Sequence, residues 1–231
     1  MKQTIMRMRR IIDLLMTLTL FFLMGYQLWG EAAHEWVGTV MGVLFLLHQW
    51  YNRRWYCTLT QGPWSLVRTF HMLVNLLSVL AMLALLASGV VLLPKGHTAS
   101  HVFDFVVLSD FIGTAQRVHL AASHWLYVLL ALHIGLHGQL LAGAFKRRAH
   151  APHGAAVAAL LRLVGAVFAL YGLTAFVARD FLDAMFLRVH FFLGDASESA
   201  LAFYVDYAAI MVCFALAAYG FVRLVRRLAR G

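Results

Sequence analysis

The sequence has little charge and few cysteines, and each shortage excludes classes of protein. Only 13% of the 231 residues are charged, about half the ~25% of a typical soluble domain. A soluble enzyme, a disordered chain and a coiled coil all need more charge than this. The two cysteines, Cys57 and Cys213, are too few for a disulfide scaffold or for an iron–sulfur cluster, which takes four thiolates.

Long apolar runs take the place of charge, and 62% of the chain is hydrophobic. A helix needs ~20 mostly apolar residues to cross the ~30 Å hydrocarbon core of a bilayer. Six segments meet this requirement, namely residues 11–29, 32–51, 69–93, 118–142, 156–177 and 201–222. The sequence therefore predicts an all-α, polytopic membrane bundle of six transmembrane helices with the lipid bilayer as its surroundings.

The net charge of +9 predicts a topology and not a nucleic-acid partner. Basic residues that bind nucleic acid share one face of a domain, whereas here they stand in small groups between apolar runs. With the N-terminus inside, fourteen of the nineteen Lys and Arg residues fall on the cytoplasmic side, as the positive-inside rule requires. Both termini are thus expected in the cytoplasm. The outer connection 178–200 mixes apolar and charged residues, which is typical of an interfacial segment or of one that covers a partner contact.

Twelve histidines accompany these apolar runs, and four of them have matched spacing. His34 and His48 lie 14 residues apart in the second predicted helix, as do His119 and His133 in the fourth. Fourteen helical steps end within ~40° of the starting face and climb ~21 Å. Because both helices are expected to run inward, His34 should face His119 near the outer surface and His48 should face His133 near the cytoplasm. Two such pairs are what two bis-histidine b haems need.

Three further histidines are candidates for neighbouring roles. His137 lies one turn beyond His133 on the same face, so either could ligate the inner iron. The matched spacing favours His133, which leaves His137 to a haem propionate or a quinone. We expect His124, which is off this face, to support a ligand or to pack, and His71 to serve a quinone site or a structural role.

Other side chains are candidates for contacts with the haem ring and its propionates. Gly38 and Gly42 would let a flat macrocycle approach the second helix, although two glycines four residues apart are also typical of plain helix packing. Basic residues are expected near the anionic propionates, namely Arg53, Arg54 and Arg68 at the inner haem and Arg117 and Lys95 at the outer one. Arginines on the cytoplasmic side are expected from topology alone, so only Arg117 gives independent support for a propionate contact.

Several motifs together resemble a known family. They are His34-Glu35-Trp36-Val37-Gly38, His48-Gln49-Trp50-Tyr51-Asn52, Ser88-Gly89-Val90, Val118-His119 and His133-Ile134-Gly135-Leu136-His137. Across about residues 8–145 the chain resembles the flavinylation-associated cytochromes, which belong to the bacterial di-haem membrane cytochromes b. The resemblance implies a four-helix di-haem core in residues 1–145, two added helices in 146–231, and a place in the bacterial inner membrane. It also implies electron transfer between the quinone pool and an extracytoplasmic redox partner, often a flavoprotein.

Two other functions fit the same apolar chain. In the first, the histidines form a relay in a proton or metal transporter, which the lack of paired acidic residues inside the helices disfavours. In the second, haem merely stabilises a non-catalytic anchor subunit. A visible spectrum separates the first of these from a cytochrome, and a response to quinol separates the second.

Overall fold

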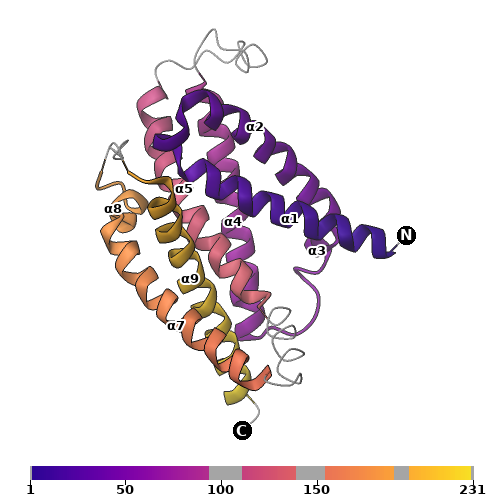
Figure 1. Ribbon diagram of the computed structural model, residues 1–231. Coiled ribbons are helices and arrows are strands. Elements are labelled where there is room, and N and C mark those ends of the chain that lie inside the picture. Colours follow the sequence, from indigo (N-terminus) through magenta and orange to yellow (C-terminus); the bar gives the residue numbers. More distant parts are fainter. Residues whose placement is uncertain (1, 94–110, 139–153, 190–197, 230–231) are drawn as a thin grey trace.

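The computed structural model of the chain describes residues 2–93, 111–138, 154–189 and 198–229, and this part is all-helical (Figure 1). Its six long helices agree with the six predicted segments in number and order. The described helices are α1 (Lys2–Met24), α2 (Tyr26–Asn52), α3 (Arg54–Cys57), α4 (Leu66–Leu92), α5 (Ile112–Leu136), α7 (Gly154–Ala178), α8 (Phe181–Met185) and α9 (Ala200–Leu228).

Four of the described helices, α4, α5, α7 and α9, are long and apolar enough to cross a bilayer. Helices α1 and α2 have the length but not the composition. The first turns of α1 carry three arginines, followed by Asp13, and α2 carries Glu31, Glu35 and two histidines. A helical protein with four candidate membrane spans is thus confirmed, while the arrangement with six spans stays a prediction.

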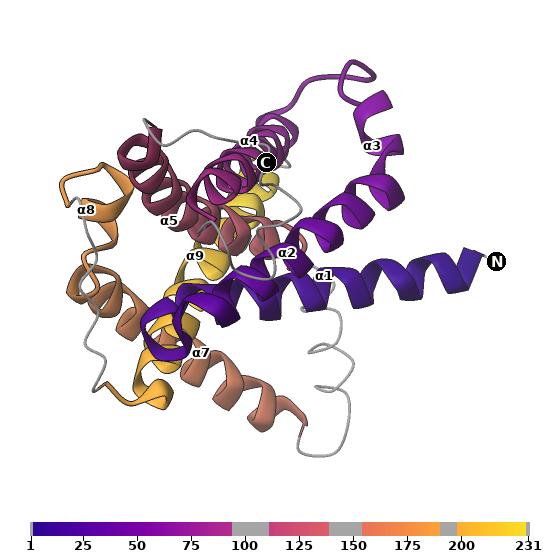
Figure 2. The same cartoon turned by 90° about the horizontal axis from the view of Figure 1, so that it is seen from above.

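The four candidate spans form a row, and the first two helices lie across it. Helix α4 packs on α5, α5 on α9 and α9 on α7. Helices α1 and α2 pair with each other as a hairpin, which is inclined to the other helices (Figures 1 and 2). Since α9 packs directly on α5, the chain segments 1–145 and 146–231 share one core.

Buried aromatic side chains join the middle of the bundle. Tyr127 of α5 and Phe203 and Tyr207 of α9 are fully buried, as is Phe181 of α8. The Tyr127 hydroxyl donates a hydrogen bond of 2.7 Å to the backbone carbonyl of Tyr207. The Phe203 and Tyr207 rings stack with centroids 4.2 Å apart. These contacts hold α9 against the part of α5 that carries the histidines.

Helix α8 lies in the connection 178–200, and it packs into the bundle. Phe181, Ala184 and Met185 are buried, and the Trp125 indole N–H donates a 3.0 Å hydrogen bond to the carbonyl of Met185. This part of the connection therefore covers α5. Residues 190–197 of the same connection lie outside the described part of the chain.

Two glycines set the hairpin between α1 and α2, and they move the predicted helix boundaries. The first helix was expected to reach residue 29, but it ends at Met24 because the chain turns at Gly25, where a side chain would meet Tyr204. Gly30 has a φ of 79° and a ψ of 176°, a conformation that is essentially restricted to glycine. It separates the single turn at Tyr26 from the rest of α2.

An ion cluster ties the end of α7 to α9, and we predict that it stabilises the fold. Arg179 donates to Asp206 at 2.7 and 2.9 Å and to Glu198 at 2.7 Å, and Tyr171 also donates to Asp206. The three charged side chains are only 15–18% exposed. Arg179→Gln leaves two facing carboxylates without their cation, so the free energy of unfolding should fall by about 3 kcal/mol. Thermal unfolding in detergent measures this change.

Arg188→Gln is the matched control for that prediction. Arg188 pairs with Asp183 at 3.5 Å, and both side chains are well exposed. Exposed pairs contribute ~0–1 kcal/mol, so this variant should keep the thermal midpoint. Equal shifts in the two variants would show that the buried cluster has no special role.

Candidate functional site

The first predicted histidine pair lies between α2 and α5. The imidazole centroids of His34 and His119 are 6.0 Å apart. Two imidazoles on opposite sides of one metal ion, each with a nitrogen ~2.0–2.1 Å from it, have centroids roughly 6 Å apart. The structure therefore brings these two rings to a separation that suits two ligands of one ion.

Ser88 of α4 bonds to His119, and its other contacts indicate which ring nitrogen carries hydrogen. The Ser88 hydroxyl donates its hydrogen to the carbonyl of Ala84 at 2.7 Å. Its oxygen lies 3.0 Å from Nδ1 of His119 and therefore accepts a hydrogen bond from that nitrogen. Nε2 of His119 then keeps its lone pair. Nδ1 of His34 is buried and has no hydrogen-bond partner among the described residues.

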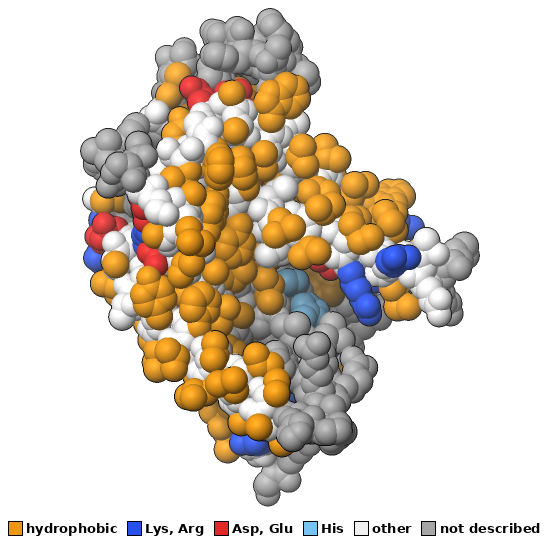
Figure 3. Space-filling view, in the orientation of Figure 1, with side chains coloured by type: hydrophobic (Ala, Val, Ile, Leu, Met, Phe, Trp, Pro, Cys, Tyr) orange, Lys and Arg blue, Asp and Glu red, His pale blue; other side chains and the backbone are white. Residues whose placement is uncertain are grey.

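The second predicted pair belongs to a larger histidine cluster near the other end of α2 and α5. Nδ1 of His48 lies 2.8 Å from a carboxylate oxygen of Asp13 in α1. A carboxylate only accepts, so Nδ1 donates, and in the neutral imidazole Nε2 then has the lone pair. His48 and Asp13 lie within electrostatic range of His133. Histidine side chains are visible in a hollow below α1 (Figure 3).

His133 is held in the same way, from α4. Its Nδ1 lies 2.8 Å from the amide oxygen of Asn75, which accepts a hydrogen bond and leaves Nε2 with a lone pair. The His133 and His137 rings have centroids 4.8 Å apart, and those of His137 and His71 are 6.2 Å apart. The cluster thus runs from α2 through α5 to α4.

The hydrogen bonds of these imidazoles match those of histidines that bind metals. Histidines that bind metals usually donate the other ring N–H to a carboxylate, an oxygen or water, which orients the ring. His48, His119 and His133 all have this arrangement. Among the described residues, no three or more His, Cys, Asp or Glu side chains are grouped to hold a bare ion. Histidine pairs instead fit a cofactor that supplies the remaining ligands of its own metal.

The other candidate histidine and the two glycines lie beside apolar side chains. His124 is buried, its Nδ1 lies 2.8 Å from the Leu120 carbonyl, and its ring packs on Phe181. A side chain at Gly42 would lie 3.2 Å from the end of the Leu86 side chain of α4, so this glycine leaves room for that side chain. At Gly38 the nearest atom would belong to Leu23 of α1, at 4.0 Å.

The candidate arginines lie at the surface or contact other residues of the chain. Arg68 donates to four carbonyls, those of Thr58, Leu59, Gly62 and Pro63. This side chain therefore holds the connection between α3 and α4. Arg53 lies over the Trp50 ring, and Arg54 and Arg117 are exposed. Lys95 lies outside the described residues.

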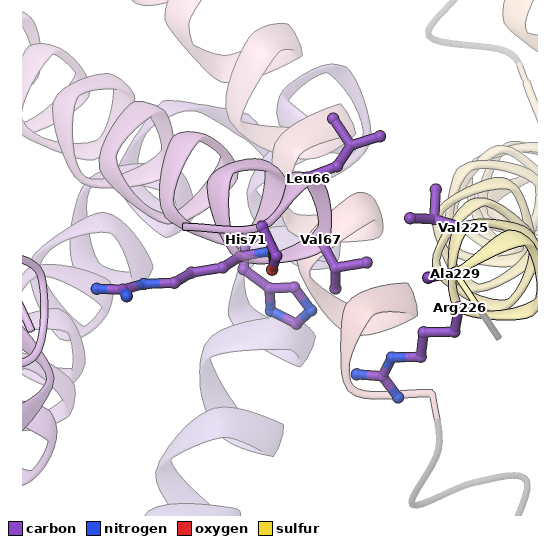
Figure 4. Close-up of a pocket in the computed structure, with 8 residues that line it drawn as sticks. Leu66, Val67, His71, Val225, Arg226 and Ala229 are labelled. Atoms are coloured by element: carbon purple, nitrogen blue, oxygen red, sulfur yellow. Dashed lines mark hydrogen bonds between the residues drawn. The ribbon is translucent and has the colours of Figure 1, made fainter. Parts of the chain in front are cut away.

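An open groove of about 620 Å³ lies near the histidine cluster, between the start of α4 and the end of α9 (Figure 4). His71 reaches it from α4 and Arg226 reaches it from α9. The full lining is Ser65, Leu66, Val67, Arg68, His71, Val225, Arg226 and Ala229. His71 is therefore the residue that connects the groove with the histidine cluster.

Three partners of the histidines are absent from the predicted site residues, namely Asp13, Asn75 and Ser88, although Ser88 belongs to one of the motifs that carry the family resemblance. The sequence carries a signal for Asn75, because it is the one asparagine in the apolar segment Leu66–Leu92. A polar side chain at that depth needs a partner. Ser88 and Asp13 carry the same signal, but neither residue indicates which histidine it binds.

Comparisons of the chain with protein-family models, with curated proteins and with solved structures found no match. What the chain does is therefore inferred from its own residues and their arrangement.

Proposed function

We propose that this chain is a transmembrane electron carrier that binds two b-type haems. His34 and His119 would hold one iron, and His48 and His133 would hold the other. A bound b haem supplies one-electron redox chemistry. The residues of this chain would bind the irons, exclude water, and set the potentials through hydrogen bonds to the ligands.

The hydrogen-bonding of Nδ1 in three of the four histidines carries this proposal. Asp13, Ser88 and Asn75 come from two different helices, yet each engages the same ring nitrogen of its histidine. His124, which packs, also bonds through Nδ1, but to the Leu120 carbonyl of its own helix, whereas these three rings are held by side chains of other helices. A shared tautomer with Nε2 available is expected when every ring binds a metal.

The inner ligand is better assigned to His133 than to His137. His133 is oriented by Asn75, whereas His137 caps the C-terminal end of α5 and is exposed. A ligand whose ring is already oriented loses less entropy on binding. His137 is then available for a propionate or for the path to the groove.

The polar residues of α1 and α2 are compatible with two more membrane spans. Asp13 and His48 bind each other, and His34 lies against His119 on the side facing the bundle. Ionisable groups inside a membrane are tolerated when they pair, as Asp13 does with His48, or face the bundle interior, as His34 does. We therefore propose six spans in a bacterial inner membrane, with both termini cytoplasmic, as the distribution of basic residues implies.

The resemblance of residues 8–145 to the flavinylation-associated cytochromes supports a physiological role. In this role the chain connects the membrane quinone pool with an extracytoplasmic redox protein that contains flavin. The haems would lie at two depths, because 14 residues of helix span ~21 Å. That spacing suits electron transfer across the membrane.

A haem count on the purified protein tests the proposal. The pyridine haemochrome assay should find two b haems per chain, and the reduced-minus-oxidised visible spectrum should show their bands. A protein without haem would refute the proposal and favour a histidine relay. A protein with haem that responds neither to quinol nor to a redox partner would favour a stabilised anchor subunit.

Ser88→Ala is expected to weaken haem binding at the His119 site alone. The variant removes the acceptor that orients His119, and losses of such partners reduce metal affinity by about 10- to 100-fold. Titration of the apoprotein with haem measures the change. Ser78→Ala is the matched control, because the Ser78 hydroxyl of the same helix donates only to the carbonyl of Val74. If both variants bind haem as the parent protein does, Ser88 does not orient a ligand.

A further inference from the structure

The groove between α4 and α9 has an apolar lining with two polar side chains at one side. Leu66 and Val67 line it from α4, and Val225 lines it from α9. The His71 ring and the Arg226 guanidinium project to the same side of this space (Figure 4). Small-molecule sites typically combine an apolar lining with a few such orienting groups.

The groove is connected to the inner histidine pair by adjacent rings. The His71 and His137 centroids are 6.2 Å apart, and the His137 and His133 centroids are 4.8 Å apart. A molecule that contacts His71 would therefore lie two imidazoles away from a proposed iron ligand. A redox-active ligand at this position can exchange electrons with the proposed haem, whereas a structural lipid has no such function.

The charges around the groove also disfavour an anionic head group. Arg68 lines the groove, but its guanidinium donates to four backbone carbonyls of the connection before α4. The nitrogen donors that remain for a ligand are then those of His71 and Arg226, beside the Ser65 hydroxyl, whose oxygen accepts from the backbone N–H of Arg68. One unengaged cation and one imidazole suit two neutral acceptor oxygens on an apolar ring better than a phosphate, which favours several cations.

From these contacts we propose that the groove binds the head group of a membrane quinone. His71 and Arg226 donate hydrogen bonds to the carbonyl oxygens, while Leu66, Val67 and Val225 contact the ring and the start of its tail. Both helices are candidate membrane spans, so the ligand reaches the groove from the lipid. The redox use of this site rests on the proposed di-haem function, but binding itself does not.

Photoaffinity labelling of the full-length protein tests the site. The probe is an azidobenzoquinone with a decyl tail, applied to protein in phosphatidylcholine nanodiscs, and labelled peptides are located by mass spectrometry. The label should fall at the start of α4 and the end of α9. His71→Leu and Arg226→Leu should each reduce labelling about tenfold below saturation, since a lost hydrogen bond of this kind costs ~1.4 kcal/mol.

Two matched variants separate binding from folding. His71→Gln keeps a side-chain donor and should retain most of the labelling. Arg227→Leu removes an exposed neighbouring arginine that does not line the groove, and it should label as the parent protein does. Unmodified decylubiquinone should compete with the probe. Labelling outside the groove, or labelling that survives both leucine substitutions, would overturn the proposal, as would competition by phosphatidylglycerol but not by decylubiquinone.

The haem content of the same samples distinguishes this site from the proposed function. Two haems with no label in the groove would reject the quinone site and leave the cytochrome proposal standing. Label in the groove with no haem would support the site and reject the cytochrome proposal.

Discussion

Replacing His119 with alanine is expected to reduce the haem content from two per chain to one. The His34 and His119 rings are 6.0 Å apart, and removing one of them leaves an iron with a single axial imidazole. The other pair lies near the opposite end of α2 and α5, so it should keep its haem. His34→Ala should have the same effect, whereas His48→Ala or His133→Ala should remove the other haem. The pyridine haemochrome assay counts haems, and a redox titration shows which potential is lost.

Two histidine variants serve as controls for the haem count. His124→Ala removes a buried imidazole that packs on Phe181, and it should destabilise the protein without removing a haem. His137→Ala should also keep two haems if His133 is the inner ligand. Loss of the inner haem in His137→Ala but not in His133→Ala would transfer the ligand role to His137. Two haems in all four ligand variants would make the assignment wrong.

The long helices could be predicted from sequence because apolar length is recorded directly in the chain. All six predicted segments have a long helix, but the predicted turn of the first hairpin is misplaced. There the apolar run continues through Gly25 to residue 29, so hydropathy alone does not indicate the turn. The turn depends on Tyr204 of α9, which contacts Gly25 and accepts a hydrogen bond from Trp29. A residue so distant in sequence leaves no local signal.

The helix faces that carry the histidines could be predicted from spacing, but the residues that hydrogen-bond to the histidines could not. Spacing of 14 residues places two imidazoles on one face whatever the helix packs against. Which residue of α4 meets His119 depends on the rotation and tilt of α4, and these are set by packing. Ser78 and Ser88 look alike in sequence, yet only Ser88 contacts a histidine ring. The groove at His71 likewise requires α9 to lie beside α4.

Replacing Gly135 or Gly172 with alanine is expected to destabilise the bundle strongly. A methyl group at Gly135 would overlap the backbone carbonyl of Ala215, and one at Gly172 would overlap that of Ala209. Backbone cannot rotate away as a side chain can, so α9 would have to move. Overpacking of this kind costs about 3 kcal/mol, which thermal unfolding in detergent measures. Gly165→Ala and Gly220→Ala are the controls.

Changes in stability of opposite sign in the two pairs of variants would show that close packing, and not helix propensity, explains the glycines at positions 135 and 172. Nothing lies within 4 Å of a side chain added at Gly165 or Gly220, so alanine there should stabilise by up to about 1 kcal/mol.

The two destabilising variants, Gly135→Ala and Gly172→Ala, should also differ from each other in their effect on haem binding. Gly135 belongs to α5, which carries His119 and His133, whereas α7 carries no proposed ligand. Gly135→Ala should therefore weaken haem binding as well as folding, while Gly172→Ala should reduce stability and leave two haems. Equal haem loss in both variants would mean that haem binding depends on the overall stability of the bundle and not on the position of α5.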